Sequence, residues 1–440
     1  MSIPVNTLYI IPIQDKFIIY QPLNKLAFIG NASMVKLVQD IHEKREIDED
    51  KNREAISFLK AYGFYNPSDI EPLKHEQEEY KPVVCVLCLT SACNFRCSYC
   101  FANGGETKST ELPEETGKKA IDLVYQNALD RHEKKFTVSF HGGGEPTLPF
   151  EKLKQFTAYA RSKRSDSRIE LTSNGYWDNE KSMWILDNID NLTLSFDGME
   201  EIQNRQRPLA NGKETFKTII KNIQKLDEKK LKYGIRLTVT QKSVKCLPES
   251  IAFLCKNTAC TTFQVEPVFG AGRALTNNQV IKDNKSFIKN FLDAFDIATE
   301  HGRYLYYSGA RPWVITSRFC SAHDNALVVT PEGILSSCYE ISGSDHPLAK
   351  VFHFGKLTGS GKLTIDTRIR NHFQNKIRER KELCQSCFCY WHCAGDCPAK
   401  TFTPGSPENT KFSDRCEINR EITKELLIRY LSQNEGIYKG

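Results

Sequence analysis

Residues 91–101 read SACNFRCSYCF and place Cys93, Cys97 and Cys100 in the spacing C-x3-C-x2-C. Three thiolates on one short loop can hold three corners of an iron–sulfur cube, which normally takes four cysteines. The fourth iron would lack a protein ligand and could bind and reduce a small molecule. A zinc loop or three buried thiols are the alternatives, but zinc sites usually pair one C-x2-C unit with a second pair or with histidines close by.

The size and composition of the chain indicate a globular protein of two or three domains. It has 440 residues, of which 40% are hydrophobic and 26% charged. The net charge of +6 is too slight to argue for nucleic-acid binding. The first residues, MSIPVNTLYIIPIQDKF, contain neither a basic leader nor a long apolar run, so we expect no signal peptide and no membrane partner. These features predict a cytoplasmic protein.

The sixteen cysteines are unevenly distributed along the chain. None lies in residues 1–84, five lie between positions 85 and 100, and eight lie between positions 320 and 416. Cytosolic thiols are kept reduced, so cysteines in an intracellular protein of this size are expected to be metal ligands rather than disulfides. The pattern therefore predicts two separate regions of metal chemistry.

Residues 83–270 show strands that alternate with amphipathic helices. Apolar residues recur at spacings of three and four in the predicted helices. Such alternation predicts an α/β fold with a parallel sheet covered by helices. The candidate strands are residues 83–90, 135–142, 168–175, 191–198, 234–241 and 262–268.

The cysteine loop resembles the signature of radical S-adenosylmethionine (radical SAM) enzymes, including the aromatic Tyr99 before the last cysteine. The resemblance implies a partial (β/α)6 barrel over residues 83–270. It also implies that S-adenosyl-L-methionine binds a 4Fe-4S cluster held by Cys93, Cys97 and Cys100. Ligand groups should lie at the carboxyl ends of the strands, as they do in complete barrels.

The sequence also contains the groups that the resemblance assigns to the cofactor. HGGGEP at 141–146 resembles the GGE motif, in which glycines admit close backbone approach and Glu145 accepts a hydrogen bond from the methionine amine. Arg207 is expected at the cofactor carboxylate, a task that suits a guanidinium. Relatives often show His-Asp where this chain has Gln203-Asn204. Turn, surface or core roles stay open for all of these residues. The remaining expected cofactor contacts are Tyr99, Gly142, Gly143, Gly144, Ser173 and Asn174, and the expected pocket residues are Asp197, Gln264 and Glu266.

A second group of cysteines follows a connector at residues 271–318. Its spacing resembles the SPASM domain over residues 319–425, and the resemblance implies two auxiliary 4Fe-4S clusters. By analogy the outer cluster would be held by Cys384, Cys387, Cys393 and Cys416, and the inner one by Cys320, Cys338 and Cys397. A treble-clef zinc fold is the alternative.

Two fully ligated cubes need about eight thiolates, and this motif offers seven. Either a cysteine outside the motif, such as Cys389, Cys255 or Cys260, completes the inner cluster, or one iron stays open. An open iron could bind the thiolate of a substrate cysteine.

Residues 1–80 predict a small winged-helix-like α+β domain, with three short strands followed by two helices. It resembles the leader-peptide recognition domain of enzymes that modify ribosomally made peptides. This segment carries nine Lys/Arg and thirteen Asp/Glu, a net charge of −4 that argues against a DNA-binding winged helix. A purely structural domain is the other alternative. Residues 67–82, which are polar and contain three prolines, are the predicted linker.

Together these resemblances imply a maturase that modifies a leader-bearing precursor peptide, with an electron donor such as flavodoxin or ferredoxin. A thioether from cysteine sulfur to carbon is the expected product. Carbon–carbon crosslinking and the oxidation of a sulfatase Ser or Cys to formylglycine are alternative activities. A non-catalytic iron–sulfur electron carrier or peptide-binding protein is the alternative from a different class.

Overall fold

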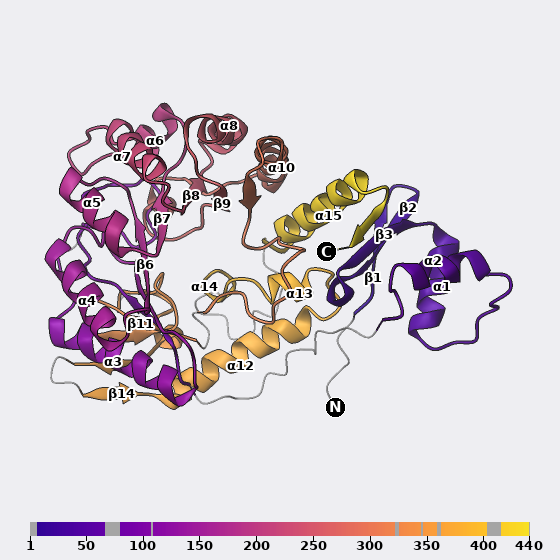
Figure 1. The fold of residues 1–440 in the computed structure, drawn as a ribbon, viewed down its shortest axis with the longest axis horizontal. Helices are drawn as coiled ribbons and strands as arrows, with labels where there is room; N and C mark the ends of the chain where they lie inside the picture. The colour runs from indigo at the N-terminus through magenta and orange to yellow at the C-terminus, as the bar shows by residue number, and fades with distance from the viewer. Residues whose placement is uncertain are drawn as a thin grey trace.

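The computed structural model describes residues 7–66, 80–106, 109–321, 325–344, 346–358, 362–402 and 415–439. Its two sheets have four and eleven strands, and the larger one forms the helix-covered body on the left of Figure 1. Most of the predicted linker, residues 67–79, lies outside the described residues.

The six predicted barrel strands are confirmed. They are neighbours in chain order, and every adjacent pair is parallel. Their carboxyl ends therefore lie at one end of the sheet. The strands are β4 (Val84–Leu87), β5 (Thr137–Phe140), β6 (Arg168–Ser173), β7 (Asn191–Ser195), β8 (Tyr233–Val239) and β9 (Thr262–Pro267).

Helices cover the outer face of this sheet because their apolar residues recur on one side. In the helix over residues 216–228, Phe216, Ile219, Ile223 and Leu226 are buried at the spacing of a helical stripe. In β8, burial alternates with each residue, so every second side chain faces the barrel interior. The covering helices are α3 (Glu114–Asp130), α4 (Phe150–Lys163), α5 (Asn179–Asn188), α6 (Glu200–Gln206), α7 (Phe216–Glu228) and α8 (Leu247–Asn257), with a 3-10 turn, η2, at Val244–Cys246.

The sheet extends beyond the six predicted strands at both edges. β10 (Tyr304–Tyr306) is parallel to β9, and β11 (Ala326–Val329) is parallel to β4. Each is only three or four residues long, too short for sequence periodicity to mark it. The antiparallel strands β12 (Ile334–Ser336), β13 (His353–Leu357) and β14 (Leu363–Ile365) continue from β11. The intervening helices are α9 (Arg273–Thr276), α10 (Asn284–Glu300) and α11 (Ala349–Phe352).

The C-terminal helices lie between the barrel and the N-terminal sheet (Figure 1). The longest of them, α15, packs against α10 on one side and contacts β3 and β15 of the small sheet on the other. This segment comprises α12 (Thr367–Leu383), α13 (Tyr390–Cys393), α14 (Pro398–Thr401) and α15 (Arg415–Gln433).

The small sheet contains the three strands predicted for the N-terminal region, and the two predicted helices follow them. The sheet also contains one strand that was not predicted. This is β15 (Ile437–Lys439), from the far end of the chain, which pairs antiparallel with β3. The N-terminal elements are β1 (Tyr9–Ile13), β2 (Lys16–Gln21), η1 (Pro22–Asn24), β3 (Leu26–Gly30), α1 (Ala32–His42) and α2 (Arg53–Ala61).

The two faces of the small sheet are buried in different cores. One face packs on α1 and α2, where Phe28, Leu37 and Leu59 are buried. The other face carries Tyr9, Ile18 and Tyr20 and packs on Trp391 of α13 and on Leu427 and Leu431 of α15. The N-terminal unit therefore shares a hydrophobic core with the cysteine-rich C-terminal segment. No helix among the described residues has the length and apolarity needed to cross a membrane.

We predict that Leu427→Ala lowers the thermal midpoint of unfolding measured by circular dichroism. Leu427 is fully buried in this shared core, and truncating a buried leucine costs about 2–5 kcal/mol. Leu275 is 62% exposed, so Leu275→Ala should change stability by less than about 0.5 kcal/mol. Equal midpoints for the two variants would contradict the shared core.

Candidate functional site: a three-cysteine cavity and two further thiol groups

The loop after β4 carries the three signature cysteines, and several backbone contacts hold it in place. The guanidinium of Arg96 donates to the carbonyl oxygens of Cys93, Phe95 and Gly105. From the loop after β9, Arg273 Nε donates to the carbonyl oxygen of Cys97 at 2.9 Å. The loop is thus held at the carboxyl end of the barrel, with its three thiols on the wall of one cavity.

Burial makes the thiols of Cys93 and Cys97 poor acids in the absence of a cation, because it raises the pKa of both. It raises the pKa of Cys93 to about 12, an effect to which the neighbouring Cys97 and Glu145 add. Burial also raises the pKa of Cys97 to about 11, although Arg207 and Arg273 oppose the rise. A positively charged metal centre would compensate for the cost of forming these thiolates.

The HGGGE segment after β5 lies directly against the cysteine loop. The amide nitrogens of Gly144 and Glu145 donate to the carbonyl oxygens of Thr90 and Ala92, both at 2.8 Å. A Cβ atom on Gly144 would lie 1.9 Å from the Ala92 carbonyl oxygen. Gly143 has a φ of +67°, a conformation that side chains disfavour. This contact needs glycine because the two backbones touch.

Glu145 connects the predicted cofactor residues on β6 to one another. Its Oε1 accepts hydrogen bonds from Ser173 Oγ at 2.7 Å and from Thr147, and its Oε2 accepts one from the Asn174 amide at 2.8 Å. Asn174 Nδ2 in turn donates to Asn94 Oδ1 in the cysteine loop at 2.8 Å. Oε2 keeps a free lone pair on the cavity wall. A contact with the methionine amine, as predicted, would use that lone pair.

Tyr99 bridges a cation and an anion behind the cysteine loop. Arg207 Nη1 donates to the Tyr99 hydroxyl at 2.6 Å, and that hydroxyl donates to Asp197 Oδ2 at 2.8 Å. Arg207 Nε is buried and has no hydrogen-bond partner within the described ranges. The Arg207 side chain lies on the cavity wall, as expected of a residue that binds a carboxylate.

The geometry does not support a pocket role for Asp197. Its carboxylate is 3% exposed and accepts hydrogen bonds from Tyr99, Gln206 and the Thr238 amide, so it lies behind the cavity wall. Burial raises the pKa of Asp197, and Arg207 opposes that rise. Asp197 therefore positions Tyr99 and Gln206 rather than facing a ligand.

Glu266 at the end of β9 does face the cavity. Its Oε1 accepts hydrogen bonds from Gln264 Nε2 and the Ser308 amide, whereas its buried Oε2 has no partner in the part of the chain that the structure describes. Burial opposes ionisation, but the cations of Lys400, Arg415 and Arg236 hold the pKa of Glu266 below its usual range. Gln264 does not line the cavity but holds Glu266 from behind, which corrects its predicted pocket role.

The space between the cavity walls, counting the open mouth, is about 1160 Å³. The cavity wall carries three thiols, a run of glycines, and the buried atoms Arg207 Nε and Glu266 Oε2, which have no partner among the described residues. These groups are the ones that a cluster and its sulfonium cofactor require. Cys93, Cys97 and Cys100 would hold the cluster. Glu145, Asn174 and Arg207 would hold the cofactor.

Sequence reasoning missed several residues of this cavity region. Arg236, Tyr339 and Lys400 line the cavity, and Arg273 clamps the cysteine loop from outside. Arg236 could have been found from the sequence, because it is a charged residue at one of the alternate positions of β8 that face the barrel interior. The other three come from segments whose position depends on the tertiary fold.

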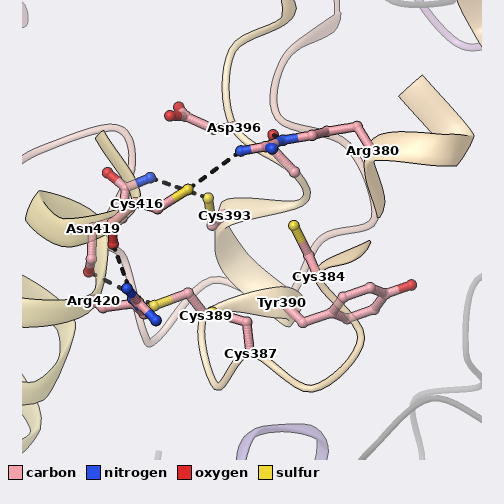
Figure 2. Close-up of a pocket in the computed structure, with 11 residues that line it drawn as sticks. Arg380, Cys384, Cys387, Cys389, Tyr390, Cys393, Asp396, Cys416, Asn419 and Arg420 are labelled. Carbon is pink, nitrogen blue, oxygen red and sulfur yellow. Dashed lines mark hydrogen bonds between the residues drawn. The ribbon is translucent and has the colours of Figure 1, made fainter. Parts of the chain in front are cut away.

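The four thiols predicted for the outer auxiliary cluster surround a single hollow (Figure 2). Arg380 donates to Cys416 Sγ at 3.2 Å, and Asn419 Nδ2 donates to Cys393 Sγ at 3.3 Å. The pKa of Cys387 is lowered to about 7, chiefly by a hydrogen bond from Cys389, with Arg420 and Arg380 contributing. These donors and cations would stabilise thiolate sulfur. The four are Cys384, Cys387, Cys393 and Cys416.

The three thiols predicted for the inner cluster form a second group. Burial raises the pKa of Cys397 to about 12; Lys400 opposes the rise, and Glu340 and Cys320 add to it. Cys397 and Cys320 likewise act on the pKa of Cys338. Tyr339 and Glu340, which follow Cys338 directly, line the three-cysteine cavity. The inner thiol group therefore adjoins that cavity.

The other cysteines do not join the inner group. Cys389 lines the outer hollow, and Cys255 and Cys260 lie in the main barrel core. No three Cys, His, Asp or Glu side chains in the described ranges converge as the ligands of one metal ion would.

Comparison with known proteins places this geometry in a family. Residues 87–253 match the Radical SAM superfamily. An uncharacterised protein of Methanocaldococcus jannaschii is 32% identical over 38% of this chain and 57% of its own length, so the chain spans less than two thirds of that relative. The sporulation killing factor maturation protein SkfB of Bacillus subtilis is 23% identical over 71% of this chain and 76% of SkfB.

Two solved structures share the fold. The structure of anSMEcpe with bound AdoMet and Kp18Cys peptide gives a TM-score of 0.63 at 18% identity, covering 80% of this chain and 98% of that one. Streptococcus suis SuiB bound to precursor peptide SuiA gives 0.53 at 14% identity, covering 92% and 97%. Over residues 87–253 the chain is therefore similar to radical SAM enzymes, a class that uses S-adenosylmethionine and a 4Fe-4S cluster. Its sequence resembles that of SkfB, and its fold resembles those of anSMEcpe and SuiB.

We predict that Gly144→Ala disrupts the three-cysteine site. The new methyl group would meet the Ala92 carbonyl at 1.9 Å, so the cysteine loop must shift. Release of 5′-deoxyadenosine under anaerobic reduction should fall about tenfold or more, which corresponds to a barrier change of 1.4 kcal/mol. The matched control is Gly234→Ala, whose Cβ would meet its nearest atom at 3.7 Å. Equal rates in both variants would refute the tight contact.

We expect Tyr99→Phe to weaken S-adenosylmethionine binding about tenfold in equilibrium dialysis. Without the hydroxyl, Arg207 loses a charge-assisted hydrogen bond worth about 1.5–3 kcal/mol and its link to Asp197. Tyr159→Phe on α4 removes a similar hydroxyl, which donates to Asp122 on the outer helix layer, and should leave binding unchanged. An unaltered affinity in Tyr99→Phe would show that Arg207 does not depend on this bridge.

Proposed function

We propose that this radical SAM enzyme is a maturase that modifies a ribosomally made precursor peptide and joins a cysteine sulfur to a carbon as a thioether. The observation that carries the proposal is the position of the inner thiol group. Tyr339 and Glu340 connect Cys338 to the wall of the three-cysteine cavity. A substrate in that cavity would lie between the radical source and a second set of thiols.

The relatives support a peptide as the substrate. SkfB is named as a maturation protein, and both SuiB and anSMEcpe have been solved with peptides bound. By the same reasoning we propose that residues 1–80 recognise the leader of the precursor and that residues 83–270 carry out the radical chemistry. Residues 271–318 would connect this barrel to residues 319–425, which would hold two auxiliary 4Fe-4S clusters.

The chemistry balances with the groups proposed. When bound, the radical SAM cluster supplies the electron that splits S-adenosylmethionine into methionine and a 5′-deoxyadenosyl radical. Thioether formation then removes two hydrogens from the peptide: one as an atom from a carbon, taken by that radical, and one as the thiol proton. The surplus electron needs an acceptor, and an auxiliary cluster is the proposed one. With three cysteines, the inner site would leave a position for the substrate thiolate.

Charged residues of this chain provide the polar contacts for a peptide. Glu266 Oε2 is a buried acceptor without a partner within the residues described, and Arg236 and Lys400 lie on the same wall. An ionised carboxylate suits a peptide N–H group, and the two cations suit peptide carbonyl oxygens. These contacts would hold the reacting carbon still and exclude water.

A row of aromatic rings leads from the cavity to the small sheet. Burial and the nearby Glu266 carboxylate raise the pKa of Tyr306, which begins the row close to the cavity. Successive ring centroids are 5.5–5.7 Å apart, and Tyr304 is 42% exposed. We propose that this row guides the peptide segment between leader and reacting residue. Its members are Tyr306, Tyr304, Trp313, Tyr430 and Tyr438.

The main experiment incubates the reconstituted enzyme anaerobically with S-adenosylmethionine, a strong reductant and a candidate precursor peptide that contains cysteine. The expected results are release of 5′-deoxyadenosine and a product that has lost two hydrogens and kept its sulfur. An electron carrier would release no nucleoside. Loss of sulfur would indicate formylglycine formed from a cysteine instead. Loss of two hydrogens from a peptide whose cysteines are all replaced by alanine would refute the thioether and indicate a carbon–carbon crosslink or the oxidation of a serine to formylglycine.

We predict that Trp313→Ala raises KM for that peptide about tenfold, because an aromatic anchor at a binding surface contributes about 1–2 kcal/mol or more. The slow cleavage of S-adenosylmethionine without peptide should stay unchanged, since Trp313 lies outside the cavity. Trp184→Ala, on α5 of the outer helix layer, is the matched control. An unchanged KM in Trp313→Ala would remove the aromatic row from the peptide path.

A further inference from the structure

A buried ion pair lies between the two groups of auxiliary thiols. Arg415 Nε and Nη2 donate to the two carboxylate oxygens of Asp396 at 2.9 and 3.2 Å. The side chains are 4% and 1% exposed. Asp396 belongs to the turn that joins Cys393 of the outer group to Cys397 of the inner group, and Figure 2 shows it beside the outer hollow. Arg415 directly precedes Cys416.

The turn that carries Asp396 is held in an unfavourable conformation. Ala394, Gly395 and Asp396 have φ values of +50°, +88° and +67°, so three consecutive residues are left-handed. Each non-glycine residue in this region costs about 1–2 kcal/mol. Asp396 Oδ1 also accepts a hydrogen bond from the Cys397 amide at 2.8 Å. The ion pair thus holds a strained link of three residues between the outer and inner thiols.

Both members of the pair reach the thiol groups through short contacts. The Arg415 guanidinium lies 5.3 Å from the ring centroid of Tyr307, whose hydroxyl donates to Asn419 Oδ1 at 2.8 Å. Asn419 Nδ2 donates to Cys393 Sγ on the outer side. On the inner side, Asp396 binds the Cys397 amide directly. Buried charges interact strongly because water does not screen them.

We infer that Asp396 and Arg415 are a positioning pair whose balanced charges set the reduction potentials of both auxiliary clusters. This inference rests on the proposed function, because the two auxiliary clusters are part of that proposal. The potential of an iron–sulfur cluster depends on nearby charge and on hydrogen bonds to sulfur. Reduction adds negative charge, so an uncompensated Arg415 favours the reduced state and an uncompensated Asp396 disfavours it. The two ends of the pair therefore act with opposite sign.

The test uses Asp396→Asn, Arg415→Gln and the double variant, each in the full chain with Cys93, Cys97 and Cys100 replaced by alanine, so that only auxiliary clusters are reconstituted. Redox titration followed by electron paramagnetic resonance gives the potentials. At a fixed solution potential, Asp396→Asn should raise the ratio of reduced to oxidised cluster about tenfold, which is 59 mV for one electron. Arg415→Gln should lower that ratio, because it leaves the Asp396 carboxylate uncompensated. The double variant should return close to the parent.

The matched control is Asp296→Asn, which breaks the ion pair of Asp296 with Arg429 farther along α15 and should move neither potential. If Asp396→Asn loses its clusters, Arg415→Gln is compared with the double variant. These two variants differ only in the Asp396 carboxylate, so the comparison tests the effect of its charge. Shifts of the same sign in both single variants, no shift, or loss of the clusters in all three variants would overturn the inference. Absence of auxiliary clusters from the parent protein is a different result, because it would refute the cofactors of the proposed function.

Discussion

The backbone contact between the glycine segment after β5 and the cysteine loop after β4 is the constraint on which the site depends. Gly144 approaches the Ala92 carbonyl so closely that no side chain fits between them. Because of this contact, the loop lies across the ends of the parallel strands instead of extending into solvent. Glu145 then reaches Ser173 and Asn174, and Asn174 reaches back to Asn94, which closes a ring of hydrogen bonds around the cavity.

The C-terminal segment connects parts of the molecule that the chain itself separates. Its helix α15 packs on α10 and on the small sheet, and the chain then ends as a strand of that sheet. Trp391 beside the outer thiols is buried in the same core as Tyr9 and Tyr20. A partner that binds the N-terminal unit would therefore act on a surface that packs directly against the cysteine-rich C-terminal segment.

Buried charges in the cavity are arranged in compensated groups. Arg207 and Asp197 are linked through Tyr99, while Glu266 is surrounded by Lys400, Arg415 and Arg236. Isolated ions would be costly in such an interior. Among the buried polar atoms that lack partners in the described chain, Arg207 Nε and Glu266 Oε2 lie on residues that line the cavity. This combination gives the cavity fixed donors and acceptors before any ligand arrives.

The amino-acid sequence by itself determined the class of this protein and the arrangement of its barrel. The six strands, the three-cysteine loop and the HGGGE segment are local patterns, because strand period, turn residues and cysteine spacing depend on neighbouring residues. The roles of the individual cofactor residues stay predictions.

Tertiary structure alone decided which distant residues meet. The chain brings β15 to β3, β11 to β4, and Tyr339 and Lys400 to the cavity, and it places Asp197 behind Tyr99 instead of on the wall. Strands of three or four residues are too short to show an alternating pattern of apolar residues. The residues next to a buried charged residue in the sequence do not reveal which side chain it contacts. Such contacts arise only when the helices and sheets pack, so reading along the chain could not reveal them.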